Sequence, residues 1–294
     1  MTALAQATVY GLLQGGLLAL VAIGFSLVWG VMNIVNIAHG SFVIVGAYLT
    51  WELSDRLGID PFLGMLPVAV VMFAVGYLLQ RYLINLVVNA PIFITLLLTF
   101  GLELVLIQAM NIAFTANYRS IRTSYASHSF VIGSVHVPVG RLLAFAIAVL
   151  VTVGLATAVR HTRTGTSIMA TGMDRGAARL MGIRAGHVYA LTFGISVAIA
   201  ALAGAMIGTI GTFNAASAGT YTLQAFVIAV IGGLGNMYGA LAGGLLIGLA
   251  EAWAGQYLPG TWVNAIAFLL LILVLMVRPQ GLIGKAYYSA RVEV

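Results

Sequence analysis

The stretch RHTRTGTSIMATGMDRGAARLMGIR, residues 160–184, lies between two long apolar runs at 139–160 and 186–210. It contains five arginines but a single acidic residue, Asp174. Each apolar run is long enough for one helix to cross the hydrocarbon of a bilayer, which takes about 20 residues. This pattern predicts two membrane-spanning helices joined by a basic loop.

The composition of the whole chain is typical of a membrane protein. Of its 294 residues, 62% are hydrophobic and 7% are charged, and the mean hydropathy is +1.08. Soluble domains carry roughly a quarter charged residues, so a chain this apolar needs the bilayer as its solvent. The net charge of +6 indicates basic loops on one side of a membrane rather than a nucleic-acid partner. The absence of cysteine excludes disulfides and thiolate chemistry.

Apolar runs of suitable length occur along the entire chain. We expect an all-α, polytopic membrane helix bundle of about eight or nine spans that forms a single domain over 1–294. Small residues four apart, such as Gly11 and Gly15, predict close helix packing. The runs at 37–52 and 219–233 are short and rich in glycine, so either can be half of a broken helix. The candidate spans are 6–30, 37–52, 62–80, 92–114, 139–160, 186–210, 219–233, 237–257 and 262–279.

The distribution of basic residues predicts the orientation of these spans. If the loop at about 160–185 is cytoplasmic, strict alternation also places Arg81 and the basic C-terminal tail inside. The opposite side then holds the acid-rich segment 52–61 and the polar loop 115–138. With nine spans, the N-terminus is expected outside.

Within the basic loop, MDRGAARLMGI (173–183) predicts a short helix that ends at Gly182. Ala177, Ala178 and Met181 would form a small apolar face on this helix. Two interpretations stay open, an ordinary basic loop or a docking helix that fits a groove on a soluble partner. The docking interpretation involves Asp174, Arg175, Ala177, Ala178, Arg179, Met181 and Gly182.

Polar residues occur at membrane depth near the first short run. Such residues are costly in the bilayer, so they usually face a cavity or each other. Asn33, Asn36 and His39 have the spacing of one helical stripe just before Gly40. They either line a translocation path or sit in a tight turn and cap the helix that starts near residue 37.

A weak internal sequence repeat favours the translocation path. GVMNIVNIAHG (30–40) is similar to GTFNAASAG (211–219) with two residues deleted, which aligns Asn33 with Asn214. Both segments precede short apolar runs. Corresponding interrupted segments in two halves of a chain predict a path formed by broken helices.

Glu103 is the costliest residue within a predicted span, since it lies in the middle of TLLLTFGLELVLIQ (95–108). It has three candidate roles: pairing with Gln108, pairing with His39, or contacting a substrate amine.

Three sets of motifs resemble the permease subunits of branched-chain amino acid importers of the ATP-binding-cassette class (LivH-like). The first is GVMNIVNIAHGSFVIVGAY (30–48). The second is MDRGAARLMGI followed by YALTFGISVAIAALAGAMIG (189–208). The third is IGGLGNMYGALAGGLLIGLAEAW (231–253) with the closing RPQGLIG (278–284).

This resemblance implies a transport subunit and not an enzyme, in the bacterial inner (plasma) membrane. Its substrates would be branched-chain or other hydrophobic amino acids, although relatives of this type also move urea, amides and aromatic acids. The implied partners are a second permease subunit or a second copy, two cytoplasmic ATP-binding-cassette ATPase subunits, and a periplasmic or extracellular solute-binding protein.

The residues themselves agree with a transport subunit that leaves ATP hydrolysis to its partners. The lone lysine, Lys285, lacks the glycine spacing of a phosphate-binding loop, so we expect ATP hydrolysis to reside in partner subunits. The scattered histidines predict no metal site, and no cofactor is expected. The alternative is an ion-coupled secondary transporter that works without an ATPase through Glu103 or His39. The missing catalytic set argues against an intramembrane enzyme.

Overall fold

Eleven α-helices, two short 3₁₀ helices and one β-hairpin make up the described part of the chain. The structure is a computed structural model that describes residues 2–123, 128–132 and 135–284. The α-helices are α1 (Thr2–Met32), α2 (His39–Leu57), α3 (Pro61–Tyr82), α4 (Ile92–Phe114), α5 (Val139–His161), α6 (Arg163–Met173), α7 (Arg175–Leu180), α8 (Ala185–Ile210), α9 (Ala218–Gly232), α10 (Met237–Tyr257) and α11 (Gly260–Val277). The 3₁₀ helices are η1 (Ile84–Leu86) and η2 (Ala215–Ser217), and the strands are β1 (Ser129–Ile132) and β2 (Val135–Pro138).

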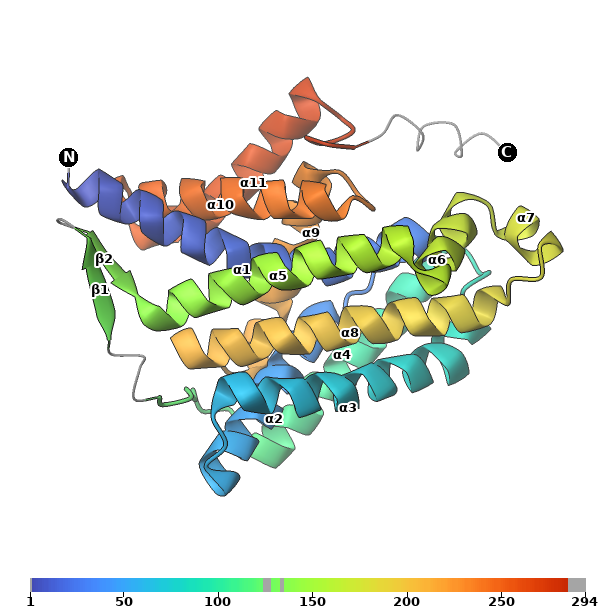
Figure 1. The fold of residues 1–294 in the computed structure, drawn as a ribbon, viewed down its shortest axis with the longest axis horizontal. Helices are drawn as coiled ribbons and strands as arrows, with labels where there is room; N and C mark the ends of the chain where they lie inside the picture. Colours follow the sequence, from blue (N-terminus) through green and yellow to red (C-terminus); the bar gives the residue numbers. More distant parts are fainter. Residues whose placement is uncertain (1, 124–127, 133–134, 285–294) are drawn as a thin grey trace.

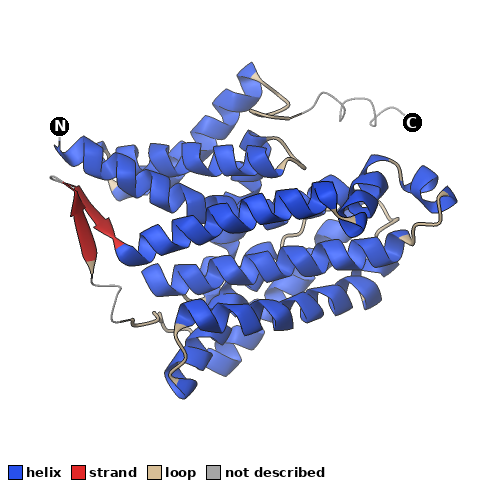
Figure 2. Ribbon diagram, viewed as in Figure 1, coloured by secondary structure: helices blue, strands red, loops and turns tan. Residues whose placement is uncertain are grey.

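The two ends of the bundle differ (Figure 1). At one end β1 and β2 pair antiparallel, from Ser129 opposite Pro138 to Ile132 opposite Val135. The N-terminus lies at this end, which we call the hairpin end. At the other end α6 and α7 project from the long helices, and we call it the loop end. The hairpin falls within the predicted polar loop 115–138 and is the only strand structure in the described residues (Figure 2).

The all-α membrane bundle predicted from the sequence is confirmed. Seven helical segments of the described chain are long and apolar enough to cross a membrane. The other two predicted spans form α2 and α11. The last turns of α2 carry Glu52, Asp55 and Arg56, so α2 is too highly charged to count among these seven. Helix α11 has 18 residues and contains the apolar stretch Ala265–Val277.

Helices α1 and α8 form the centre of the bundle. The most apolar window of the α1 span is 83% buried inside the protein, whereas that of α4 is 17% buried. The predicted close packing at Gly11 and Gly15 is confirmed. A Cβ on Gly15 would lie 2.7 Å from the Gly244 carbonyl oxygen, so α1 and α10 touch backbone to backbone.

Two helices begin inside the bundle rather than at its surface. The Nε2 atom of His39, the first residue of α2, lies 2.8 Å from the carbonyl oxygen of Val21, which is far from either end of α1. The chain enters α2 through residues 33–38, which are not helical. It enters α9 in the same way, through extended residues and η2. Both short predicted runs are therefore broken helices, as their length and glycine content indicated.

Candidate translocation and docking sites

The first turns of α2 and α9 meet in the interior, and we call residues 33–41 together with 214–222 the half-helix junction. The Gly40 N–H donates to Thr222 Oγ1 at 2.8 Å. A Cβ on Gly40 would overlap the Ala218 carbonyl oxygen, so only glycine permits this approach. The positive ends of two helix dipoles therefore lie side by side within the bundle.

Two threonines supply hydrogen-bond partners to the non-helical backbone before α2. Thr99 Oγ1 accepts from the Ile37 N–H at 3.2 Å and lies 3.3 Å from the Val35 carbonyl oxygen. Thr222 Oγ1 lies 2.9 Å from the Ile37 carbonyl oxygen. Irregular backbone at membrane depth requires such partners because no water replaces them. The sequence analysis missed both threonines, although a hydroxyl residue in an apolar run beside a broken helix is the available signal.

The amide of Asn36 has no hydrogen-bond partner among the residues that the structure describes. Its side chain is 1% exposed, and neither Oδ1 nor Nδ2 forms a hydrogen bond. His39 is also fully buried; its Nε2 bonds Val21, but its Nδ1 has no partner. Buried polar groups are normally satisfied, so unpartnered ones call for an explanation in terms of a ligand, a water or a conformational change.

The single helical stripe predicted for Asn33, Asn36 and His39 is wrong. Asn33 adopts a φ of 54°, which ends α1 at Met32 and breaks the expected helical stripe. Asn33 is therefore exposed, while Asn36 and His39 are buried. The capping role also fails, because the N-cap of α2 is Ala38 and it has no side-chain hydrogen bond.

Asn214 and Glu103 lie on the α9 side of the junction. Asn214 Oδ1 accepts from the Ser217 N–H at 3.1 Å and from its hydroxyl at 2.8 Å, which starts η2 and then α9. Glu103 is buried, and its Oε1 lies 3.9 Å from the position that a Cβ on Gly219 would occupy. A carboxyl group there faces the positive end of α9.

The expected partners of Glu103 are placed differently. Gln108 is exposed, and the ring of His39 is turned to Val21. The half-helix junction thus contains the buried side chains of Asn36, His39 and Asn214, with Glu103 of α4 facing it, while Asn33 at its edge is exposed.

The loop end is built from two short helices separated at Asp174. The Asp174 Oδ1 atom accepts from the Gly176 N–H at 2.7 Å and the Ala177 N–H at 3.0 Å, which starts α7. Gly182 ends it with a φ of 82°, while the Ile183 N–H reaches the Ala178 carbonyl at 3.0 Å. The short helix predicted over 173–182 is confirmed in its last part.

The apolar face predicted for this helix is wrong. Ala178 is buried against the protein, whereas Ala177 is exposed. The large exposed apolar side chains are Met173, Leu180 and Met181, at 77%, 90% and 83% exposure. The break at Asp174 is the reason, because it turns α7 away from the direction of α6. We call Met173, Leu180 and Met181 the apolar tip.

The arginines of α7 have different surroundings. Arg175 donates a hydrogen bond to the Asn89 side chain, and its guanidinium lies 5.3 Å from the Tyr189 ring centroid. It therefore anchors α7 to the segment before α4 and to α8, rather than pointing toward a partner as expected. Arg179 is exposed.

Comparison with known proteins identifies the family. The profile of the family described as branched-chain amino acid transport system / permease component matches residues 7–275, which is most of the chain. The chain belongs to this permease family. The high-affinity branched-chain amino acid transport system permease protein BraD of Pseudomonas aeruginosa is 32% identical over 294 residues, 95% of each chain. No solved structure gives a significant match.

Two further relatives extend the similarity to other organisms. LivH of Escherichia coli K12, with the same description as BraD, is 32% identical to the permease over 292 residues and 94% of each chain. A probable branched-chain amino acid transport permease protein LivH of Methanocaldococcus jannaschii is 26% identical over 286 residues, 93% of this chain and 90% of its own. The transport role predicted from the motifs is confirmed: the permease is a multi-pass transport subunit and not an enzyme. Nothing in the comparisons supports the ion-coupled alternative.

Proposed function

We propose that this permease works in an ATP-binding-cassette importer that moves branched-chain or other hydrophobic amino acids across the bacterial inner membrane. The names of BraD and LivH, which refer to high-affinity branched-chain amino acid transport, support the substrate class. A second permease subunit or second copy, two ATPase subunits and a solute-binding protein complete the importer. The loop end faces the cytoplasm, because residues 160–184 hold five arginines and one acid.

The observation that carries this proposal is the apolar tip. Helix α7 projects beyond the ends of the long helices, so its exposed apolar side chains lie outside the bundle (Figure 1). Large exposed apolar side chains at the end of α6 and the end of α7 fit a groove on a soluble partner. We assign that groove to the ATPase, and Leu180 and Met181 to the contact.

The half-helix junction is the proposed gate of the translocation path. Two helix N-termini and the free amide of Asn36 provide hydrogen-bond donors for the carboxylate of an amino acid. In the present conformation the junction is closed, since α2 and α9 touch at Gly40. Separation of α2 from α9, transmitted from α7 through α8, would expose these donors.

Leu180→Asp tests the docking role. We expect leucine uptake by the complex reconstituted in liposomes to fall more than about tenfold, since loss of one buried leucine costs about 1.5–3 kcal/mol. Recovery of the ATPase with the permease should fall in parallel. The matched control is Leu57→Asp, which places the same charge at an exposed leucine at the end of α2, outside the apolar tip, and should leave both measurements unchanged. Normal uptake by Leu180→Asp would contradict the docking role.

Omission experiments test the importer itself. Leucine uptake should require the ATPase, ATP and the binding protein together. Uptake by the permease alone would contradict the proposal. Competition by urea, acetamide or phenylalanine, but not by leucine, would reassign the substrate within the same kind of importer.

A further inference from the structure

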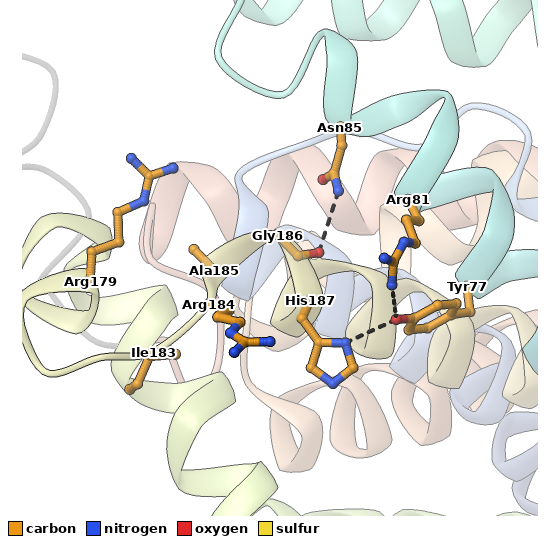
Figure 3. Close-up of a pocket in the computed structure, with 9 residues that line it drawn as sticks. All are labelled: Tyr77, Arg81, Asn85, Arg179, Ile183, Arg184, Ala185, Gly186 and His187. Carbon is orange, nitrogen blue, oxygen red and sulfur yellow. Dashed lines mark hydrogen bonds between the residues drawn. The ribbon is translucent and has the colours of Figure 1, made fainter.

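A basic cavity of about 650 Å³ opens at the loop end, where α3, α7 and α8 meet (Figure 3). Arg81 from α3, Arg179 from α7 and Arg184 and His187 from the start of α8 line it. No acidic side chain is among its described lining residues. The described lining of the cavity therefore carries positive charge and no carboxylate.

Hydrogen bonds hold part of this lining in place. Arg81 donates to the Tyr77 hydroxyl at 3.0 Å, and that hydroxyl lies 2.9 Å from His187 Nδ1. Figure 3 shows Arg81 and His187 converging on Tyr77 from two different helices. Asn85 adds a weaker link, with its Nδ2 3.4 Å from the Gly186 carbonyl oxygen. Arg81 and His187 are thus positioned by hydrogen bonds to Tyr77, whereas the side chains of Arg179 and Arg184 are exposed at the mouth of the cavity.

The cavity adjoins an exposed apolar surface on α3. Leu78 and Tyr82 directly follow the lining residues Tyr77 and Arg81 along α3, and both are exposed. Leu86 continues this exposed apolar surface into η1. Only 28% of the most apolar window of the α3 span is buried. A ligand in the cavity therefore meets basic groups on one side and a membrane-exposed apolar surface on the other.

We propose that this cavity binds the headgroup of an anionic phospholipid such as phosphatidylglycerol, with its acyl chains along α3. Arginine forms charge-assisted, often bidentate hydrogen bonds to phosphate. Basic pockets between helices at a membrane surface are typical headgroup sites. The apolar surface at Leu78 and Tyr82 favours a lipid over a free phosphate, because a free phosphate makes no use of it. A bound lipid would connect α3, α7 and α8 and hold α7 at the membrane surface. The proposal does not depend on the substrate or on ATPase coupling.

The test measures lipid preference of the full permease in phosphatidylcholine nanodiscs, using spin-labelled phosphatidylglycerol and phosphatidylcholine. The Arg81→Gln/Arg184→Gln double variant should lose at least about tenfold of the preference for phosphatidylglycerol, since each basic group near an anionic headgroup contributes about fivefold. Arg184→Lys should keep most of the preference, because it keeps the charge. The matched control is Arg163→Gln, which removes an exposed arginine at the same end outside the cavity and should leave the preference near the wild-type value.

Four outcomes would overturn the proposal. The first is an unchanged preference in the double variant, with its elution volume and helical circular dichroism intact. The second is an equal loss in Arg163→Gln, which would indicate diffuse surface charge. The third is full competition by inorganic phosphate, which would indicate a phosphate site. The fourth is loss of the preference when the ATPase is added, which would make a protein the occupant.

Discussion

Gly15 sets how closely α1 and α10 approach. A Cβ at this position would lie 2.7 Å from the Gly244 carbonyl oxygen and 2.8 Å from the Leu245 Cα. Gly15→Ala should lower the melting temperature of the purified protein by several degrees, because overpacking costs about 1–3 kcal/mol. The matched control is Gly154→Ala in α5, where a Cβ meets nothing within 4 Å. It should be neutral or stabilising, because alanine is the better helix former. Equal melting temperatures for the two variants would refute this packing.

A substitution at Asn36 can distinguish a role in transport from a role in stability. Its buried amide makes no hydrogen bond, so Asn36→Leu removes a polar group without breaking a contact and should not lower the melting temperature. If the amide serves the translocation path, uptake by the reconstituted importer should nevertheless fall. Wild-type uptake in a stable Asn36→Leu protein would remove this residue from the path.

At the scale of the element, α7 depends on its cap. Asp174 satisfies two N–H groups of the first turn, and loss of such a cap costs about 1 kcal/mol. Asp174→Ala should therefore raise the rate of tryptic cleavage at Arg175 and Arg179 by about fivefold. Asp174→Asn keeps the acceptor oxygen and should stay close to the wild-type rate. Equal cleavage of the two variants would show that the cap does not hold the helix.

An element could be predicted from the sequence where neighbouring residues alone determine it. The spans could be predicted because the length of an apolar run is itself the cause of a span. Gly182 could be predicted as the end of α7 because glycine readily adopts the positive φ found there. The break before α2 could be predicted from the short, glycine-rich run at 37–52. The positive φ of Asn33 within that break could not, because the spacing of Asn33, Asn36 and His39 also suits a helical stripe.

The candidate sites were predictable only in part, for a related reason. The sequence indicated Asn36 and Glu103 from the cost of polar groups in a membrane, and Asn214 from its alignment with Asn33. It did not indicate Thr99, because that role depends on a contact with a backbone segment about 60 residues away along the chain. The exposed side of α7 was predicted wrongly because it depends on the backbone turn at Asp174.

At the scale of the whole molecule, the two ends of the bundle should lie on opposite sides of the membrane. The chain has no cysteine, so single cysteines can be introduced without background. Thr164→Cys at the loop end should resist a membrane-impermeant maleimide in intact cells, while Ser129→Cys at the hairpin end should be labelled. Both positions are exposed, so burial does not explain the expected difference. The reverse labelling pattern would invert the proposed orientation.

The long-range partners of the half-helix junction have a consequence for biosynthesis. The hydrogen-bond partner of the Ile37 carbonyl is Thr222, which lies 185 positions later in the chain. A ribosome that adds about 5–20 residues per second synthesises Thr222 roughly 10–40 s after Ile37. During that interval the segment before α2 has an unsatisfied peptide group and is a target for membrane quality control. A chain truncated after Gly211 should therefore be degraded faster in cells than one truncated after Gly233, and equal lifetimes would contradict this order of events. The hydrogen bonds of the segment before α2 are thus completed only after α9 has been synthesised.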